Sequence, residues 1–302
     1  MDASTRVLVL VSTVLVGACA GLAVAEEQVP VFAFDPGNGT VVVTCKTLST
    51  TWVLSDGRTK YGETQGEEKV VFARTKDGYS VTMTASVLKG PTGFAAAVSQ
   101  AFAEHSLVAV IDSGGRLVSE TGLEPIVAKI GEAVPPEAKK FYSAATQQAE
   151  LLKWDQADWY ASVTSFLGHR AKVGEVWVIA TDFHSFGDPV LHCYAATKVI
   201  GRVTMQGRPC VRVQTITNND PEELRGFLGA VANTLLAGLK KLSPEAKVSG
   251  DSVRVIDPAT MIDYGGKGRD RLEAVMSFWD AGRAQATRTR VVEATVTVQP
   301  GK

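Results

Sequence analysis

The sequence has little cysteine, almost no net charge and no recognisable catalytic motif. Its 302 residues include 4 cysteines, and 32 acidic residues nearly balance 31 basic ones, for a formal net charge of −1. Charges of both signs are interspersed, which argues against a basic surface for nucleic acid. The sequence contains no G-x-S-x-G, the motif of many serine hydrolases. We therefore expect no nucleic-acid partner and no cofactor, and we expect that the protein is not an enzyme.

Two clusters of residues resemble ligand sites but lack the spacing that such sites need. Gly265-Gly266-Lys267-Gly268 is similar to a phosphate-binding loop, but Gly268 stands where that motif needs serine or threonine. The second cluster offers metal-binding side chains without a standard zinc spacing. Its members are Asp182, His184, Asp188, His192 and Cys193. We therefore predict neither a phosphate loop nor a metal site.

The N-terminus has the organisation of an export signal. Arg6 provides a positive charge, and a mostly apolar run follows over Val7–Val16. Ala23-Val24-Ala25 supplies the small-x-small pattern that a signal peptidase cleaves. The run is too short for a membrane span, which needs about 20 apolar residues. We predict a signal peptide over residues 1–25 and export to the periplasm, the cell envelope or the extracellular medium.

The same segment is compatible with a second kind of processing. Leu15-Val16-Gly17-Ala18-Cys19 resembles a bacterial lipobox, in which Cys19 becomes the lipidated first residue. Cleavage after Ala25 would release a free protein, whereas lipidation at Cys19 would tether it. Acyl chains anchor a protein because each buried CH₂ group contributes about 0.8 kcal/mol. A membrane is therefore expected as a partner only through this N-terminal anchor.

Three cysteines, Cys45, Cys193 and Cys210, follow the predicted signal. In an oxidising compartment this number favours one disulfide and one remaining thiol. A turn at Gly201-Arg202 would place Cys193 and Cys210 opposite one another, whereas a turn at Gln206-Gly207-Arg208 would not. The alternative is three buried free thiols, because cysteine is among the most buried residue types.

Most of the chain alternates with period two and is rich in Val, Thr, Ile and Tyr, a pattern typical of antiparallel strands. Gly-containing turns such as Lys76-Asp77-Gly78 and Ser113-Gly114-Gly115 predict hairpins between them. The predicted strands cover 40–47, 66–73, 78–87, 106–112, 116–120, 175–183, 190–205, 210–217, 252–256, 271–279 and 284–298.

Helices are predicted at fewer places. Asp220-Pro221 is a strong helix start, and leucines at helical spacing then predict a helix of six turns that ends at Ser243-Pro244. Residues 137–168 favour two helices with Asp155 as the cap between them. Shorter helices are predicted over 94–104 and around 123–130. We expect these helices to pack on a sheet, because their apolar stripes need a surface.

The predicted fold class is α+β, with mainly antiparallel curved sheets and helices packed on one face. Residues 110–119 are similar to residues 278–287. Both segments have the pattern of a strand, a turn that contains glycine, an arginine and a second strand. This similarity favours two related half-barrel halves, 26–170 and 171–302, that meet near Gly168 to Gly174. The alternative is that two unrelated hairpins share a common turn.

A family resemblance follows from the order of these motifs. The hairpin at Asp112-Ser113-Gly114-Gly115-Arg116 is followed by helices, by Lys172-Val173-Gly174-Glu175-Val176-Trp177 and by a long hairpin with Gly207-Arg208-Pro209-Cys210. Over residues 40–298 the chain resembles exported bacterial proteins of unknown function with V-D-x-x-G-x-V and V-G-[DE]-x-W motifs. More distantly it is similar to lipoprotein-carrier-type half-barrels, which hold acyl chains between a curved sheet and helices. The resemblance implies an envelope protein and transfers no catalytic residue.

Four aromatic residues are the predicted ligand-binding residues: Trp154, Trp159, Phe141 and Trp177. They could line an apolar pocket, and the alternative is ordinary core packing. Our leading hypothesis is binding of a lipid or another apolar small molecule between sheet and helices. A structural or assembly module that contacts an envelope protein is the first alternative. A hydrolase with a scattered site at His184 or His192 is the second.

Overall fold

A computed structural model describes most of the chain after Gln28. The described residues are 29–37, 39–90, 94–134, 136, 139, 143–183, 190–242, 245–278 and 282–299. The predicted signal peptide lies outside these residues, as do Cys19, Phe141, His184 and Asp188. The chain divides into two compact units, Met1–Pro30 and Val31–Lys302, and every helix and strand named below belongs to the second.

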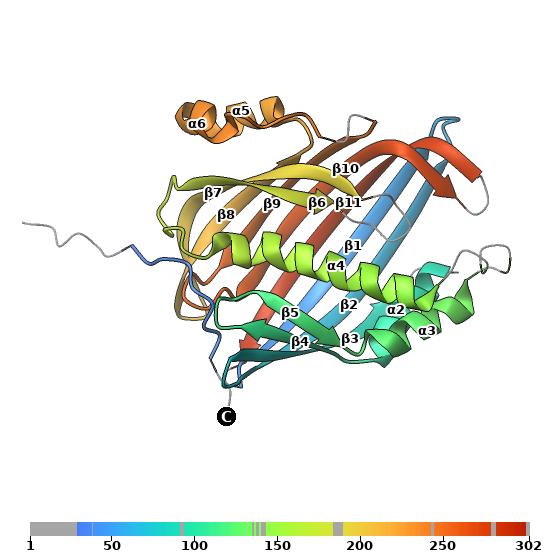
Figure 1. Cartoon of the computed structure of the whole chain (residues 1–302), viewed down its shortest axis with the longest axis horizontal. Coiled ribbons are helices and arrows are strands. Elements are labelled where there is room, and N and C mark those ends of the chain that lie inside the picture. Colours follow the sequence, from blue (N-terminus) through green and yellow to red (C-terminus); the bar gives the residue numbers. More distant parts are fainter. Residues whose placement is uncertain are drawn as a thin grey trace, which may run out of the picture. The chain divides into compact units, whose positions relative to one another are not determined.

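Eleven antiparallel strands form one sheet, in the order β5-β4-β3-β2-β1-β11-β10-β9-β8-β7-β6 (Figure 1). The first strands are β1 (Val41–Leu54), β2 (Thr59–Arg74), β3 (Gly78–Lys89), β4 (Leu107–Asp112) and β5 (Leu117–Thr121). The others are β6 (Val176–Phe183), β7 (Leu191–Met205), β8 (Arg208–Asn218), β9 (Lys247–Ile256), β10 (Asp263–Phe278) and β11 (Gly282–Gln299). The predicted curved antiparallel sheet is therefore confirmed.

The two predicted halves contribute to this sheet as two meanders. Strands β1 to β5 come from residues before 170, and β6 to β11 come from residues after 171. The halves join where β1 pairs with β11, in a register from Val41↔Gln299 to Leu54↔Ala286. One sheet thus runs through both halves, and both belong to the unit Val31–Lys302.

The described helices vary in length. They are α2 (Phe94–Glu104), α3 (Leu123–Ala133), α4 (Ala144–Ser162), α5 (Arg225–Leu228) and α6 (Ala232–Leu236), with 3-10 turns η2 (Thr164–Phe166), η3 (Pro221–Leu224) and η4 (Gly229–Val231). The prediction over 94–104 is confirmed by α2. Within the described residues, no helix combines the length and the hydropathy needed to cross a bilayer.

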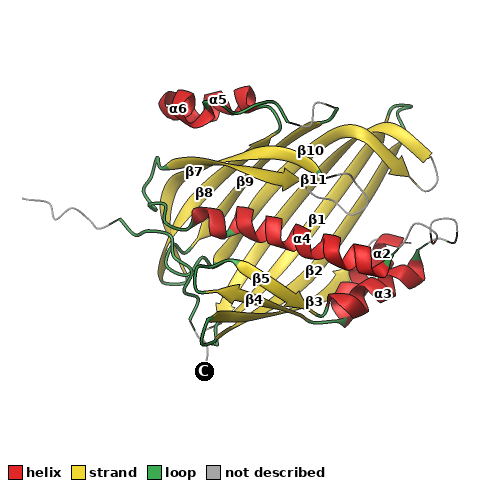
Figure 2. Cartoon of the chain, in the orientation of Figure 1, coloured by secondary structure: helices red, strands yellow, loops and turns green. Residues whose placement is uncertain are grey.

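Helix α4 lies across one face of the sheet, which we call the inner face (Figure 2). Val42, Val70 and Ile256 point from this face toward Trp159 of α4. The helix also contacts both edge strands, β5 and β6. Edge strands expose unpaired backbone groups, and proteins often cover them with a helix. A single helix thus spans the opening between the two ends of the sheet.

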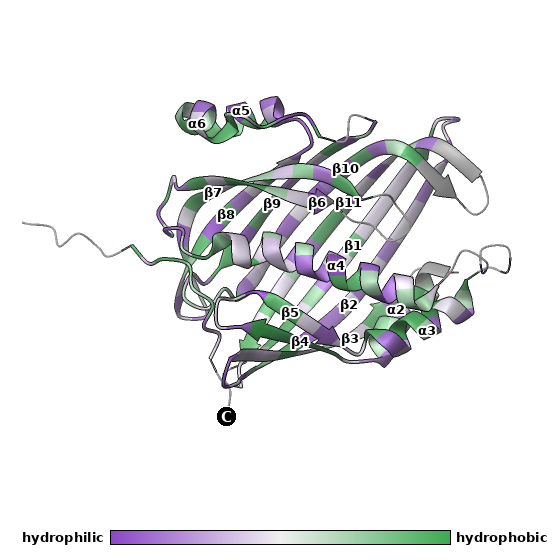
Figure 3. Ribbon diagram, viewed as in Figure 1, coloured by the Kyte–Doolittle hydropathy of each residue, from purple (hydrophilic) through white to green (hydrophobic). Residues whose placement is uncertain are grey.

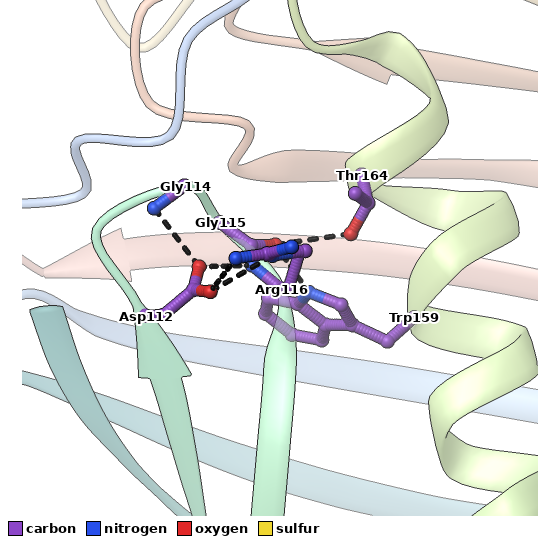
Figure 4. Close-up of polar contacts among 6 residues, drawn as sticks. All are labelled: Asp112, Gly114, Gly115, Arg116, Trp159 and Thr164. Carbon is purple, nitrogen blue, oxygen red and sulfur yellow. Dashed lines mark hydrogen bonds and ion pairs between the residues drawn. The ribbon is translucent and has the colours of Figure 1, made fainter.

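The hairpin between β4 and β5 fastens the C-terminal end of α4 (Figure 4). Asp112 accepts hydrogen bonds from the backbone N–H groups of Gly114 and Arg116, at 2.9 and 3.0 Å, which shapes the turn. The carbonyl of Gly115 then accepts from the Trp159 indole at 2.8 Å and from the Thr164 hydroxyl at 3.0 Å. The Asp-Gly turn therefore positions the helix as well as reversing the chain.

Helices α5 and α6 pack on the face opposite to α4. Leu228 and Leu236 share an apolar cluster with Tyr194 and Ala196 of β7, whereas Val199 of the same strand belongs to the cluster at the end of α4. Successive strand residues point to opposite faces, so residues 194 and 196 lie on the other face from Val199. The described helices thus cover both faces, which corrects the expectation that they pack on one.

Two predicted helices have different boundaries in the structure. Asp220 caps as predicted, because its side chain accepts from the N–H of Glu222 at 3.1 Å. The six-turn helix expected after it is instead the short elements η3, α5, η4 and α6. Gly229 adopts φ 62° and ψ −133°, which interrupts the helix. Two helices were expected over 137–168. The described residues 143–168 hold one α-helix, α4, which begins after a Ser143 cap and contains Asp155 in its interior, followed by the 3-10 turn η2.

The cysteines do not form the expected disulfide. The β7–β8 turn lies at Gln206-Gly207, so Cys210 pairs with Val203 and Cys193 lies opposite Thr181 on β6. All three described cysteines, including Cys45, are free. Burial, with Asp182 nearby, raises the pKa of Cys193 to about 12, and burial with Asp257 nearby raises that of Cys210 to about 11. Both thiols are therefore protonated and poor nucleophiles.

Gln206 completes the β11 ladder beyond the start of β10. The pairing of β10 with β11 begins at Gly265, opposite Thr295, whereas β11 continues to Gln299. The Gln206 amide donates to the carbonyl of Val296 at 3.1 Å, and its oxygen accepts from the N–H of Val298 at 3.2 Å. The Gln206 side chain thus supplies two hydrogen bonds that β10 would make with β11 if β10 extended alongside this part of the strand.

We expect Gln206→Ala to lower the free energy of unfolding by about 1–2 kcal/mol, because two hydrogen bonds are lost. Urea unfolding followed by circular dichroism measures the change. Gln285→Ala, on the exposed surface of the same β11 strand, is the control, with an expected change within about 0.5 kcal/mol. Equal changes in the two variants would contradict the role assigned to Gln206.

Candidate ligand cavity

A cavity of about 540 Å³ lies between α4 and the inner face of the sheet. Pockets for small molecules usually measure about 300–1,000 Å³. Apolar side chains from eight helices and strands and from the segment before β1 line most of it, among them Phe34, Val42, Val70, Val81, Trp159 and Ile256. Figure 3 shows apolar stretches alternating with polar ones on the strands behind α4.

The strand register explains the apolar floor of the cavity. Val42 pairs with Val70, Val70 with Met83, and Met83 with Leu107, so one row of apolar residues crosses four neighbouring strands. A second row joins Phe72, Val81 and Ala109. Residues two apart in a strand share a face, and both rows therefore point toward the cavity.

Ion pairs with partly exposed side chains also line the cavity. Lys46 of β1 pairs with Glu68 of β2. Arg254 of β9 contacts Asp263 at 3.4 Å and donates to the Ser162 carbonyl of α4 at 3.3 Å. Charged side chains are costly to bury without partners, and each of these has one. The cavity therefore offers both apolar and charged groups to a ligand.

Two carboxyl groups meet in the wall between β5 and α4. The side chains of Glu120 and Asp155 are hydrogen-bonded to one another. Burial, the negative charge of Glu120 and the hydrogen bond to it raise the pKa of Asp155 to about 8, and Asp158 adds to the effect. Burial also raises the pKa of Glu120. The two carboxyl groups are therefore not both ionised at neutral pH, and the pair shares a proton.

A buried oxygen supports this protonation. Glu120 Oε2 is inaccessible to solvent, and no N–H or hydroxyl of the described residues donates to it. An ionised carboxylate in that position would lack the donors that a buried charge needs. A proton held by the pair supplies a donor of the kind that such a buried oxygen needs.

The structure brings one of the predicted aromatic residues to the cavity. Trp159 lines it, whereas Trp154 belongs to a cluster with Leu151 and two residues of α3. Trp177 lies in the neighbouring core, where its ring stacks on His169 at 4.5 Å between centroids. Phe141 lies outside the described residues.

Sequence reasoning missed Glu120 and Asp155. Asp155 lies between Trp154 and Trp159 and was interpreted as a helix cap, although its position inside an aromatic segment was a signal of burial. Glu120 is near the end of a short strand, with no pattern that links it to a residue on a later helix. Only the packing of α4 on β5 brings the two carboxyl groups together.

The metal-like cluster is dispersed in the structure. Asp182 and His192 face one another across β6 and β7, with 2.6 Å between Oδ1 and Nδ1. Cys193 points to the other face, because it follows His192 in a strand. His184 and Asp188 lie outside the described residues. Across the described part of the chain, no three or more His, Cys, Asp or Glu side chains are grouped as metal ligands.

A second cavity, of about 510 Å³, lies between α4 and the strands β6 and β7. Its lining includes Tyr160 of α4 with Asp182 and His192. Its lining holds one carboxyl group, Asp182, and no acid pair. We therefore take the first cavity as the candidate site.

Comparisons with known proteins do not assign this chain to a family. No protein-family description and no curated protein matches it. One solved structure, which concerns lipid–protein interactions in lipovitellin, is 8% identical in sequence to this chain and has a TM-score of 0.42. The match covers 89% of this chain and 26% of the lipovitellin chain. This chain thus spans about a quarter of the lipovitellin chain.

Two other solved structures are less similar. DynF from the dynemicin biosynthesis pathway of Micromonospora chersina is 9% identical with a TM-score of 0.22, covering 89% of this chain and 90% of that one. OmpT, an outer membrane protein of Vibrio cholerae, is 7% identical with a TM-score of 0.21, covering 86% and 100%. At TM-scores below 0.5, these likenesses assign neither a family nor a function to this chain.

Proposed function

We propose that the protein binds an amphiphilic small molecule in the cavity between α4 and the inner face. The observation that supports this proposal is a cavity of about 540 Å³ with a continuous apolar floor and ion pairs in its lining. A solidly packed interface between helix and sheet would have left no room for a ligand. The binding is non-enzymatic and uses no cofactor.

The chemistry of the lining sets the class of ligand. Each buried CH₂ group of a ligand contributes about 0.8 kcal/mol, so ten of them contribute about 8 kcal/mol before the cost of association. A charged group cannot enter the apolar floor without a partner. The ligand therefore has an apolar chain or ring system over Val42, Val70 and Val81, and a polar end near the ion pairs of Lys46 or Arg254.

We propose in addition that the protein is exported to the cell envelope. The order of a positive residue, an apolar run and Ala23-Val24-Ala25 supports export, and Cys19 supplies the alternative of a lipid anchor. A native mass spectrum of the protein from a bacterial envelope tests both parts. A mature chain that starts at Glu26 or at an acylated Cys19 is expected, together with a co-purified small molecule released by organic solvent.

A variant that fills the cavity tests the site directly. Ala85 of β3 lines the cavity, and the neighbouring Ser86 is exposed on the opposite face of the same strand. We expect Ala85→Trp to weaken binding of N-phenyl-1-naphthylamine, a neutral apolar fluorophore, by tenfold or more. Ser86→Trp is the matched control and should leave the affinity unchanged.

Fluorescence titration measures the affinity, and displacement of the dye by palmitate, by a lysophospholipid and by a plain alkane ranks the ligand classes. The amphiphiles should displace the dye better than the alkane. Equal binding by the two tryptophan variants would place the dye outside the cavity. No binding by the wild type would contradict the proposal and favour a protein–protein module.

A further inference from the structure

Part of the contact between α4 and the sheet does not depend on pH. The Trp159 indole and the Thr164 hydroxyl donate to the carbonyl of Gly115, at 2.8 and 3.0 Å. Arg254 donates to the carbonyl of Ser162 at 3.3 Å. Neither the indole nor the threonine hydroxyl changes its protonation between about pH 5 and pH 10. The C-terminal end of the helix is therefore fastened throughout this range.

The contact between the middle of α4 and the edge strand β5 is of another kind. Glu120 and Asp155 both line the cavity and are hydrogen-bonded to one another. Ionised carboxylates only accept hydrogen bonds, so this contact exists only while one of the two groups carries a proton. Leu151, one turn earlier, packs on Leu123 and Val127 of α3 and keeps the helix near β5.

We propose, on the basis of the ligand cavity proposed above, that Glu120 and Asp155 form a proton-dependent latch that closes the cavity between α4 and β5. With the proton, the pair joins helix and strand. Without it, two carboxylates face one another in a poorly hydrated wall and repel. The wall then opens locally, because the ends of α4 remain attached through Gly115 and through α3. Ligand enters and leaves through this opening.

The surrounding charges favour opening once the proton leaves. Asp158, on the next turn of α4, adds negative charge beside Asp155. His105, which follows α2, also lines the cavity. The nearby cations are already paired: Lys129 of α3 with Glu104 of α2, Lys46 with Glu68, and Arg254 with Asp263. A second carboxylate in the wall would therefore be poorly compensated.

Hydrogen exchange of the ligand-free protein tests the latch. Between about pH 6.5 and pH 9.5, protection factors corrected for intrinsic rate should fall by tenfold or more in α4 and β5. Those of the central strands β10 and β11 should not change. The fall should be centred near pH 8, where Asp155 loses its proton. Uniform protection across this range would overturn the latch.

Two variants keep the test decisive. Glu120→Gln and Asp155→Asn each retain a hydrogen bond without a shared proton, and each should abolish the pH-dependent fall. Having both variants keeps the test valid if one of them fails to fold. Glu150→Gln removes an acid of α4 that pairs with Lys153 at 3.1 Å, and it should behave like the wild type. A fall that persists in both pair variants would overturn the latch.

Stopped-flow release of N-phenyl-1-naphthylamine adds a functional reading. This dye is neutral across the range, so its own charge does not change. Its dissociation rate should rise by tenfold or more at the higher pH in the wild type and stay constant in Glu120→Gln. If the dye does not bind but hydrogen exchange still depends on pH, the proposed function is rejected and the latch is retained. If the dye binds normally but hydrogen exchange does not depend on pH, the latch is rejected and the proposed function is retained.

Discussion

Replacing Asp155 with asparagine is expected to remove much of the pH dependence of stability between about pH 4 and pH 8. In the folded protein, burial and then the charge of Glu120 raise the pKa of Asp155 from 3.8 to about 8. In the unfolded chain the carboxyl returns to its ordinary pKa. Between these two values the folded state therefore binds one more proton than the unfolded state.

The sign of the effect follows from this difference in protons. The contribution of Asp155 to the free energy of unfolding is fully present below its ordinary pKa and is lost as pH rises to about 8. The largest slope for one proton is about 1.4 kcal/mol per pH unit. The measured slope will be smaller, because Asp155 is only partly buried and Glu120 shares the proton.

Urea unfolding at a series of pH values measures this slope. Wild type should lose stability as pH rises toward 8, whereas Asp155→Asn should be nearly flat and should be the more stable protein at about pH 9. Glu150→Gln, on the same helix, should keep the wild-type slope. A flat wild-type profile, or parallel profiles for wild type and Asp155→Asn, would contradict the shared proton.

Truncating Phe166 to alanine is expected to cost about 3–5 kcal/mol of stability. Phe166 is 1% exposed and lies in the 3-10 turn directly after α4. Its ring meets Phe32 and Trp177 edge-on, with centroids 5.4 and 5.0 Å apart. Arg254 lies over the same ring at 5.3 Å. The variant would lose these contacts and leave a cavity in a close-packed core.

The same variant should weaken ligand binding, because Phe166 holds both the end of α4 and the Arg254 side chain that lines the cavity. The urea midpoint and the dye affinity measure the two effects. Phe166→Leu, which keeps most of the volume, should cost clearly less than the alanine variant. Val118→Ala, at an exposed site of β5, should change stability by about 0.5 kcal/mol or less. A loss below about 1 kcal/mol for Phe166→Ala would show that this cluster is not central to the fold.

The local elements of the fold were largely predictable. Alternating apolar residues located the strands but not their full lengths, since β2 begins at Thr59 rather than at residue 66 and β10 at Asp263 rather than at residue 271. The Asp-Gly turn at Asp112 predicted the β4–β5 hairpin. The α2 boundaries and the Asp220 cap were also correct. These features depend on neighbours within a few residues, where backbone preference and side-chain period act directly. The single long helix after Asp220 failed because Gly229 takes a left-handed φ that leucine spacing does not report.

The candidate site was less predictable than the fold. Trp159 was predicted from composition and lines the cavity, whereas Trp177 is equally aromatic and lies in the core. Nothing in the residues around Glu120 indicates that Asp155 will oppose it. A carboxyl becomes a shared-proton site only when a second carboxyl and a low-dielectric wall are placed beside it.

The sequence by itself determined where the strands lie and which face of each strand is apolar, though not how far each strand extends, because these features depend on a period of two along the chain. Tertiary structure alone decided which strands pair, as where Val41 meets Gln299 across almost the whole described chain. It also decided where α4 lies, and so which charges face the cavity. The period of the side chains specifies which face of a strand is apolar, but it does not specify which element covers that face. The covering element decides how far water is excluded from the site and which charged groups meet there.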